Sequence, residues 1–439
     1  MLQTPHRPPA TVDPTLVIIL AGVCAALHVG KLPPAIAALQ VALGVTLVQA
    51  GFLLSLVQVA GMLLGLAVGL AADRLGARRS IVAGLLVLAG ASALGGAATA
   101  VWALMLLRAC EGLGFLLVVL PAPGLIRQRV APARMNLMLG AWGAYMPLGA
   151  ASALLLGPLC IEAFGWRAWW WLLGAVSVLM AIVFARWVPA LSVASEPDQP
   201  SPSTAAPKGA APLAAPPPWR ERLRQTLRAP GPWLVAWTFA LYSSQWLAVI
   251  GFLPVIYTQA GVSGAATGVL TALAAAVNII GNVASGRLLH RGVPARTLLT
   301  LGFIAMGAAA TAAFAGAAGA GLPAALRYLA VLLFSMLGGL IPATLFALAV
   351  RVAPNEHTLS TTVGWMQQWS AFGQFSGPPL VAWVASRAGD WQWTWLVTGT
   401  CSLLGLMLVR RLGKLGVAGR VDFGPGRDTP SRGEEPARR

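Results

Sequence analysis

Four ionisable side chains within long apolar segments are the residues of this sequence best suited to chemistry. His28 and Lys31 lie on one turn of the first apolar segment, and Arg108 and Glu111 lie on one turn of the fourth. Charged groups are costly in apolar surroundings and usually mark binding or proton-transfer sites there. We expect Lys31 and Arg108 to share a depth and to attract an anionic substrate, with His28 on the same helix face as Lys31.

Each of these residues also has a structural interpretation. Glu111 can carry a coupled proton, or it can form an ion pair that neutralises Arg108. His28 can be a second proton site, because imidazole titrates near neutral pH, or a hydrogen-bonded packing residue. Lys31 can face a cavity or extend to the outer lipid headgroups.

Uncharged polar and aromatic side chains in other apolar segments can complete a substrate pocket. Such groups orient a ligand by hydrogen bonds and stacking, although each can equally bridge two helices. With His28, Lys31 and Arg108, the predicted substrate-binding set comprises Tyr145, Tyr242, Gln245, Asn278, Trp365 and Gln368.

The sequence lacks the motifs of common enzymes. It contains no phosphate-binding Gly-x4-Gly-Lys-Ser/Thr, no His-Glu-x-x-His and no Gly-x-Ser-x-Gly. Cys24, Cys110, Cys160 and Cys401 lack metal-ligand spacing. We therefore predict a protein that is not an enzyme and needs no cofactor and no metal.

Composition points to a membrane protein of several spans. The 439 residues are 57% hydrophobic and only 10% charged, with a mean hydropathy of +0.75, whereas soluble domains carry about 25% charged residues. The net charge of +17 does not indicate nucleic-acid binding, because the basic residues lie in short segments between apolar runs. These features exclude a soluble enzyme and a disulfide-stapled secreted domain.

Twelve apolar runs are long enough to cross a bilayer. With both termini on one side, that side receives most of the 30 Lys and Arg residues, which predicts cytoplasmic termini. We expect the first run to remain as an anchor. The predicted spans are 16–38, 47–71, 80–98, 102–125, 135–158, 167–186, 233–257, 265–286, 297–317, 324–349, 358–384 and 393–411.

The chain divides into two similar halves. Residues 129–133 (RVAPA) recur as 351–355 (RVAPN), and Gly149 and Gly165 correspond to Gly373 and Gly389. A duplicated six-span unit is typical of transporters, which bind substrate between the halves. We predict an all-α membrane protein of two six-helix halves. Its segments are a cytoplasmic N-terminal segment (1–15), the first half (16–186), a Pro/Ala-rich linker with a basic helix (187–232), the second half (233–411) and a basic tail (412–439).

Two motifs resemble those of the major facilitator superfamily. The loop after the second span is similar to the family's Gly-x-x-x-Asp-Arg-x-Gly-Arg-Arg/Lys signature, although Ala77 replaces one basic residue. Arg108-x-x-Glu111-Gly resembles the fourth-helix Arg-x-x-Gln-Gly pattern. The resemblance covers about residues 15–411 and implies alternating access. It gives a conformational gating role to Gly69, Asp73, Arg74, Gly76, Arg78 and Arg79.

The resemblance within the family favours an anion carrier. Ala153 and Leu154 stand where drug/proton antiporters of the family carry a fifth-helix Gly-Pro. The residues around Lys31 and the fifth span are more similar to the bacterial cyanate-porter-like branch. We predict proton-coupled symport of a small organic or inorganic anion by a monomer in the bacterial inner membrane. The predicted partners are substrate, protons and the lipid bilayer, without nucleic acid. The alternative is a drug or metabolite exporter that works as a proton antiporter.

Overall fold

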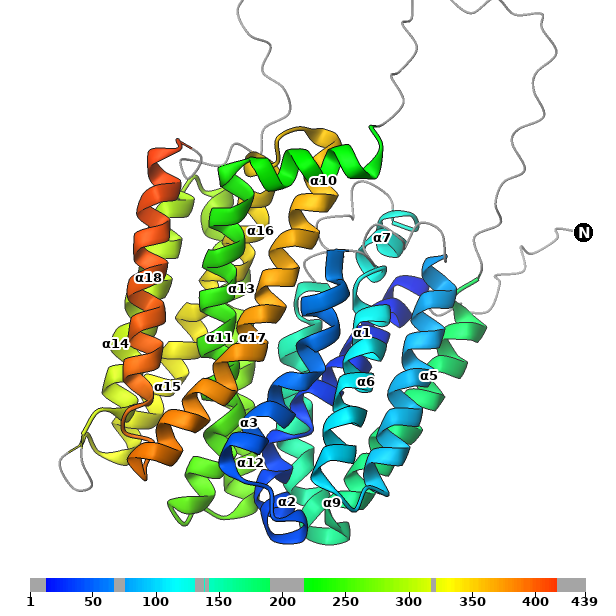
Figure 1. Cartoon of the computed structure of the whole chain (residues 1–439), viewed down its shortest axis with the longest axis vertical. Helices are drawn as coiled ribbons and strands as arrows, with labels where there is room; N and C mark the ends of the chain where they lie inside the picture. Colours follow the sequence, from blue (N-terminus) through cyan, green and yellow to red (C-terminus); the bar gives the residue numbers. More distant parts are fainter. Residues whose placement is uncertain are drawn as a thin grey trace, which may run out of the picture.

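The computed structural model describes residues 13–66, 76–130, 138, 142–189, 217–316 and 321–416, and these residues form helices without strands. Figure 1 shows two bundles side by side, one blue to green and the other green to red. The first contains α1 (Pro14–Gly30), η1 (Pro33–Ala35), α2 (Ile36–Leu43), α3 (Leu47–Ser55), η2 (Leu56–Gln58), α5 (Ala77–Gly96), α6 (Val101–Val119), α7 (Ala122–Arg127) and α9 (Tyr145–Trp187).

The second bundle follows a short helix that runs across one end of the molecule. This helix is α10 (Trp219–Arg228), and it confirms the basic helix predicted within residues 187–232. The bundle contains α11 (Pro230–Gln259), α12 (Gly264–Ala276), α13 (Asn278–His290), α14 (Ala295–Phe314), α15 (Ala324–Gly338), α16 (Leu340–Val352), η3 (Glu356–Thr358), α17 (Leu359–Ala388) and α18 (Thr394–Lys414).

Within the described residues the predicted spans fit these helices, while the end of 47–71, the beginning of 135–158 and residue 317 lie outside them. Ten helical segments of the described chain are long and apolar enough to cross a membrane. One of them, α9, holds two predicted spans, because its backbone leaves the helical region at Gly165, where φ is 83°. The more polar α17 is the eleventh predicted span. The first span also breaks at proline: α1 ends at Gly30, just before Pro33 and Pro34, which lack the N–H that a continuing helix needs.

Two corresponding glycines let helices approach closely in each half. A Cβ on Gly149 of α9 would lie 2.6 Å from the carbonyl oxygen of Val23 in α1. A Cβ on Gly373 of α17 would lie 2.1 Å from the carbonyl oxygen of Ala240 in α11. Neither site has room for a side chain. The predicted correspondence between Gly149 and Gly373 therefore agrees with their equal packing roles.

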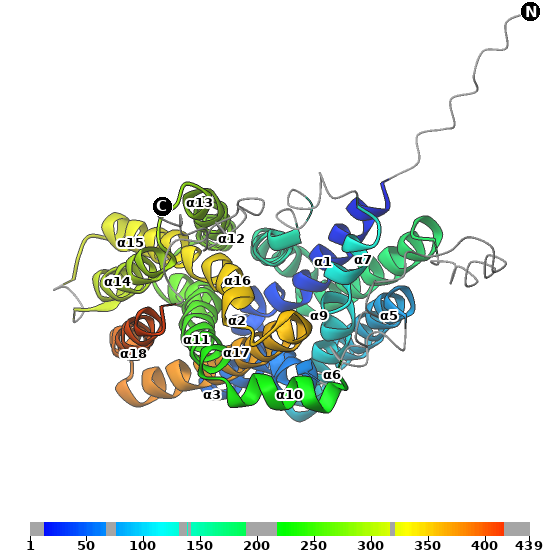
Figure 2. The same cartoon turned by 90° about the horizontal axis from the view of Figure 1, so that it is seen from above.

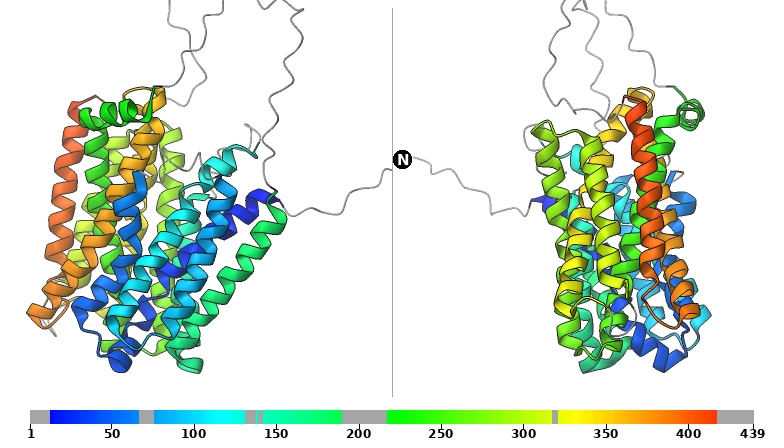
Figure 3. Two further views of the ribbon diagram at one scale, coloured as in Figure 1. Left: turned by 45° about the vertical axis from the view of Figure 1, so that its right-hand side comes forward. Right: turned by 90° about the vertical axis from the view of Figure 1, so that its left-hand side faces the viewer.

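The bundles touch at one end and are separated by a cavity at the other. Far from α10, Gly51 of α3 packs on the backbone of Pro378 and Pro379 in α17, and Leu54 packs on Gly251 of α11. Toward α10 the bundles lean apart (Figure 3, left). Viewed from that end, α10 runs along one edge of the molecule, past α17 and toward α6 of the first bundle (Figure 2). We call these the closed end and the α10 end.

Candidate functional site

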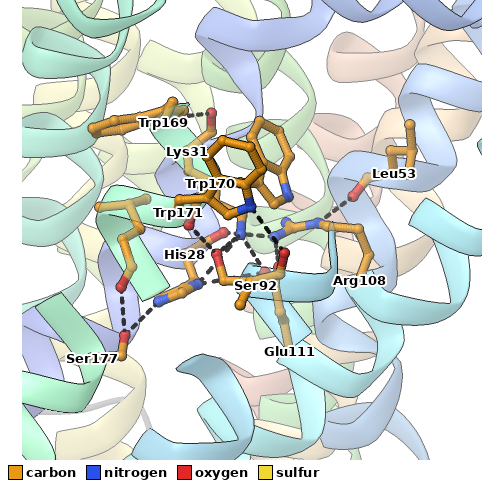
Figure 4. A network of polar contacts seen from close by, with 12 residues as sticks. His28, Lys31, Leu53, Ser92, Arg108, Glu111, Trp169, Trp170, Trp171 and Ser177 are labelled. Atoms are coloured by element: carbon orange, nitrogen blue, oxygen red, sulfur yellow. Dashed lines mark hydrogen bonds and ion pairs between the residues drawn. The ribbon is translucent and has the colours of Figure 1, made fainter. Parts of the chain in front are cut away.

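A buried ion cluster links α1, α5 and α6 in the first bundle (Figure 4). Glu111 accepts a hydrogen bond from Lys31 on one carboxylate oxygen and from Arg108 on the other. Arg108 also donates to the backbone oxygens of His28 (2.8 Å) and Leu53 (3.1 Å). The side chains of all four ionisable residues are at most 1% exposed. The cluster therefore ties three helices together away from solvent.

Hydrogen-bond partners assign the protons within the cluster. Ser177 donates to the backbone oxygen of Leu173 (2.9 Å) and so accepts from Nε2 of His28 (2.8 Å). Nδ1 of His28 can then accept from Nζ of Lys31 at 3.5 Å, and it lies 3.6 Å from Oε1 of Glu111, beyond hydrogen-bond distance, so a neutral imidazole fits these partners.

Lys31 uses its three N–H groups on Glu111, His28 and Ser92, whose Oγ lies 2.9 Å from Nζ. The ring of Trp170 lies 4.7 Å from the same nitrogen. Two cations, one carboxylate and a neutral imidazole leave the cluster with one net positive charge.

The cluster confirms that Lys31 and Arg108 lie at a common depth. The interpretation in which Lys31 reaches the lipid headgroups is wrong, because its side chain is fully buried against Glu111 and Trp170. Glu111 also does more than neutralise Arg108, since it pairs with both cations.

A cavity of about 2020 Å³ lies between the two bundles. Its lining includes the beginning of α5, the end of α7 and η3, which all lie at the α10 end. Four of the predicted binding residues line it: Tyr145, Tyr242, Asn278 and Gln368. The cavity therefore opens toward α10 and ends below at the contacts between α3 and the second bundle.

Five predicted binding residues do not line this cavity. His28, Lys31 and Arg108 are enclosed in the ion cluster. Gln245 is turned away toward Ser402, whose Oγ donates to its side-chain oxygen at 3.1 Å. Trp365 packs instead against the rings of Trp233 and Trp369. The expectation that these side chains form the pocket wall is therefore corrected for this conformation.

The cavity wall is aromatic and amide-rich. Trp142 stacks on Tyr145 with ring centroids 4.4 Å apart, and Trp246 faces the same space from the second bundle. The side-chain nitrogen of Asn278 donates to the hydroxyl of Tyr242 (3.1 Å). Gln58 and Asn282, which also contribute amides to this wall, were not among the predicted residues. The sequence signal that could have identified such a residue is an amide within an apolar span, as at Gln58.

Charge on the described wall is sparse and mainly positive. Its basic side chains are Arg78, Arg79, Arg127 and Arg287, all near helix ends at the α10 end. Among the described lining residues, Glu356 is the sole acid, and it lies in η3 at the same end. The deeper wall of the described cavity is thus uncharged.

Only part of the signature loop falls within the described residues. Gly69, Asp73 and Arg74 lie outside them. Gly76 has a φ of 76° just before α5, a conformation that glycine adopts without strain. Arg78 donates to the backbone oxygens of Ala185 and Val188, both at 2.6 Å. This side chain therefore binds the last turn of α9, while Arg79 lines the cavity mouth.

Solved structures of other proteins share this architecture. A bacterial homologue of the human lysosomal transporter Spinster, in an inward-facing and unoccupied conformation, aligns with a TM-score of 0.69. The alignment covers 94% of this chain and 96% of that one at 16% identity. The occupied inward-facing form of the homologue aligns with a TM-score of 0.67 at 15% identity, over 92% and 94% of the two chains. At these identities the likeness concerns the fold.

Sequence comparisons find short matches to export proteins. The tetracenomycin C resistance and export protein of Streptomyces glaucescens is 30% identical over 113 residues, or 25% of this chain and 21% of that protein. The multidrug resistance protein B homolog of Mycobacterium tuberculosis is 30% identical over 129 residues, or 28% and 24% of the two chains. The matches thus span between a fifth and a quarter of these relatives. The profile of the Major Facilitator Superfamily, in contrast, matches residues 18–377, and the chain belongs to this family of membrane transporters.

Proposed function

We propose that this transporter is a secondary active carrier that moves an organic anion by alternating access between its two halves. The observation that carries the proposal is the cavity between the bundles, closed at one end and open at the α10 end. In alternating access, the halves rock about a central site so that it faces one side of the membrane at a time. In this proposal, a cavity closed at one end and open at the other is one of the two required states.

Charge supports an anion over a cation. A cation that leaves water needs a carboxylate or a comparable partner to offset its lost hydration. The described deep wall offers none, and the sole acid of the described lining is Glu356 in η3 at the mouth. The arginines at the mouth and the net positive charge of the buried cluster favour a negative substrate.

Size and lining favour an organic substrate over a small inorganic ion. Pockets for drug-sized ligands measure about 300–1,000 Å³, so a cavity of about 2020 Å³ has room for such a molecule and water. Trp142, Tyr145 and Trp246 contribute aromatic side chains to the lining. Such side chains suit a substrate with a planar apolar body, so they favour an organic anion over an inorganic one.

We further propose that transport is coupled to protons through Glu111. In the present state its carboxylate is held by both Lys31 and Arg108, which stabilises the ionised form. Protonation therefore requires that one cation move away in the opposite state. Because the cluster joins α1, α5 and α6, a shift of α1 relative to α6 within the first bundle would separate Lys31 from Glu111.

The membrane orientation belongs to the same proposal. The positive-inside distribution assigns the α10 end to the cytoplasm of a bacterial inner membrane. The cavity then faces inward, the state named for the Spinster homologue.

A proton-driven exporter is the second candidate, and the short matches to the tetracenomycin C and multidrug resistance proteins favour it. An exporter would collect its substrate from the same cytoplasmic opening. The two candidates differ in the direction of net movement and in the substrate charge that is accepted.

Proteoliposomes test the carrier and its coupling. Naphthalene-1-sulfonate is a suitable probe, because it stays ionised and does not follow a pH gradient passively as a weak acid does. We expect a pH gradient to drive its accumulation by the native protein, and Glu111→Gln to abolish accumulation while retaining exchange. The symport proposal is overturned if the imposed gradient moves the probe in the antiport direction. Intact gradient-driven accumulation in Glu111→Gln would remove Glu111 from coupling.

A further inference from the structure

Gln58 is a buried amide at the closed end of the cavity. Gly51 and Leu54 of α3 contact the second bundle, and Gln58, in the turn η2 that follows α3, is the next residue along the chain to line the cavity. Its side chain is nearly enclosed, with 4% of its surface exposed. Its side-chain nitrogen is buried and has no hydrogen-bond partner among the described residues. A buried donor of this kind is costly unless a ligand or water satisfies it.

The backbone around Gln58 holds this amide in a fixed position. The α-helical pattern tightens to a 3₁₀ turn at Leu56–Gln58, a local change that often occurs at functional positions. The preceding residue packs tightly on α6, since a Cβ on Gly112 would lie 2.5 Å from the backbone oxygen of Val57. Gln58 is thus fixed against the helix that carries Glu111 and Arg108.

The ion cluster places positive charge next to this amide. Gly112, in contact with Val57, directly follows Glu111, and Arg108 donates to the backbone of Leu53 on α3. One net positive charge is therefore buried behind the closed end of the cavity. An acceptor that carries negative charge would gain both a hydrogen bond from Gln58 and attraction to the cluster.

We propose that Gln58 binds the carboxylate of an aromatic monocarboxylic acid whose ring lies among Trp142, Tyr145 and Trp246. This proposal rests on the proposed function and deepens it by assigning the substrate's polar end and its donor. The aromatic side chains line the same cavity and provide the apolar contact. Gln58 then discriminates an acid from an apolar compound of the same shape.

Calorimetry on the purified full chain tests this assignment with 1-naphthoate and the neutral 1-naphthamide at a pH where the acid is ionised. We expect native protein to bind 1-naphthoate more tightly than the amide. Gln58→Leu keeps the volume but removes the donor, so it should weaken 1-naphthoate binding about tenfold or more. Gln58→Glu adds a negative charge, so it should weaken the acid far more than the amide.

Gln374 provides the matched control. It lines the same cavity, is half-buried, and donates its side-chain amide to Ser370 at 3.4 Å. Gln374→Leu should change 1-naphthoate binding less than about twofold, because it removes an amide that already has a partner. Equal losses in Gln374→Leu and Gln58→Leu would overturn the assignment.

The outcomes separate this proposal from the broader function. If native protein binds 1-naphthoate and Gln58→Leu leaves the affinity unchanged, the role of Gln58 is refuted while the organic-anion function stands. If native protein does not bind 1-naphthoate but accumulates naphthalene-1-sulfonate, the carboxylate assignment is refuted alone. If it handles neither anion, both proposals fail. Should Gln58→Leu misfold, the contrast between acid and amide in Gln58→Glu decides the question.

Discussion

Removing the shared carboxylate should destabilise the first bundle more than removing either cation. Glu111→Gln leaves Lys31 and Arg108 buried without a counter-ion and raises the net charge of the cluster from one to two. Two like charges 4 Å apart repel by about 4 kcal/mol at an effective dielectric constant near 20. Loss of one partner from a buried ion pair costs about 3–5 kcal/mol in measured cases. The two estimates agree in size.

Lys31→Met should cost much less. It leaves the pair between Arg108 and Glu111 and makes the cluster neutral. The double change Lys31→Met with Glu111→Gln leaves one cation, so the net charge returns to its native value. We therefore expect the double variant to recover part of the stability that Glu111→Gln loses.

Thermal unfolding in lipid nanodiscs, followed by tryptophan fluorescence, measures these differences. A loss of 3–5 kcal/mol corresponds to about 6–20 °C if each bundle melts like a domain of 150–250 residues. Glu162→Gln is the control, since it removes an exposed acid of α9 and should leave the melting temperature unchanged. Glu111→Gln melting at the native temperature, or no recovery in the double variant, would refute the charge argument.

Two further predictions concern packing and gating. Gly149→Leu and Gly373→Leu should each sharply lower the yield of folded protein, because neither helix contact has room for a Cβ. Gly399→Leu is the control and should not lower it, because a Cβ there would have no atom within 4 Å. Size-exclusion chromatography after membrane extraction measures the yield, and a normal yield of the first two variants would contradict the packing. Asp73→Asn should leave insertion intact and slow transport, as the resemblance of its loop to the family signature implies, and a native exchange rate would remove this residue from gating.

Local patterns in the sequence predicted the helices and the common depth of the buried cations. The apolar runs locate the spans because the bilayer sets their length, and the opposite directions of the first and fourth spans place Lys31 and Arg108 at one depth. The equivalence of Gly149 and Gly373 could be read from the repeat, because a packing contact of this kind recurs with the unit that contains it.

The cavity wall depends on helix rotation, which the sequence alone did not define. Gln245 and Tyr242 lie on one helix, yet Tyr242 lines the cavity and Gln245 bonds to Ser402. Both lie within one predominantly apolar span, so hydrophobic periodicity does not separate a cavity-facing position from one between helices. Gln58 was not predicted for the same reason, because its position on the cavity wall depends on where the contacts between α3 and the second bundle end.

Charge selectivity in transport tests the central claim most directly. Proteoliposomes loaded with naphthalene-1-sulfonate, or with a naphthalene that carries a permanent trimethylammonium group, measure counterflow of the same labelled compound. Because the described deep cavity has no acid and a net positive cluster lies behind it, the sulfonate should exchange well above the rate of empty liposomes and the cation should not. Exchange of the cation without exchange of the sulfonate would contradict the organic-anion function and favour the drug-exporter alternative.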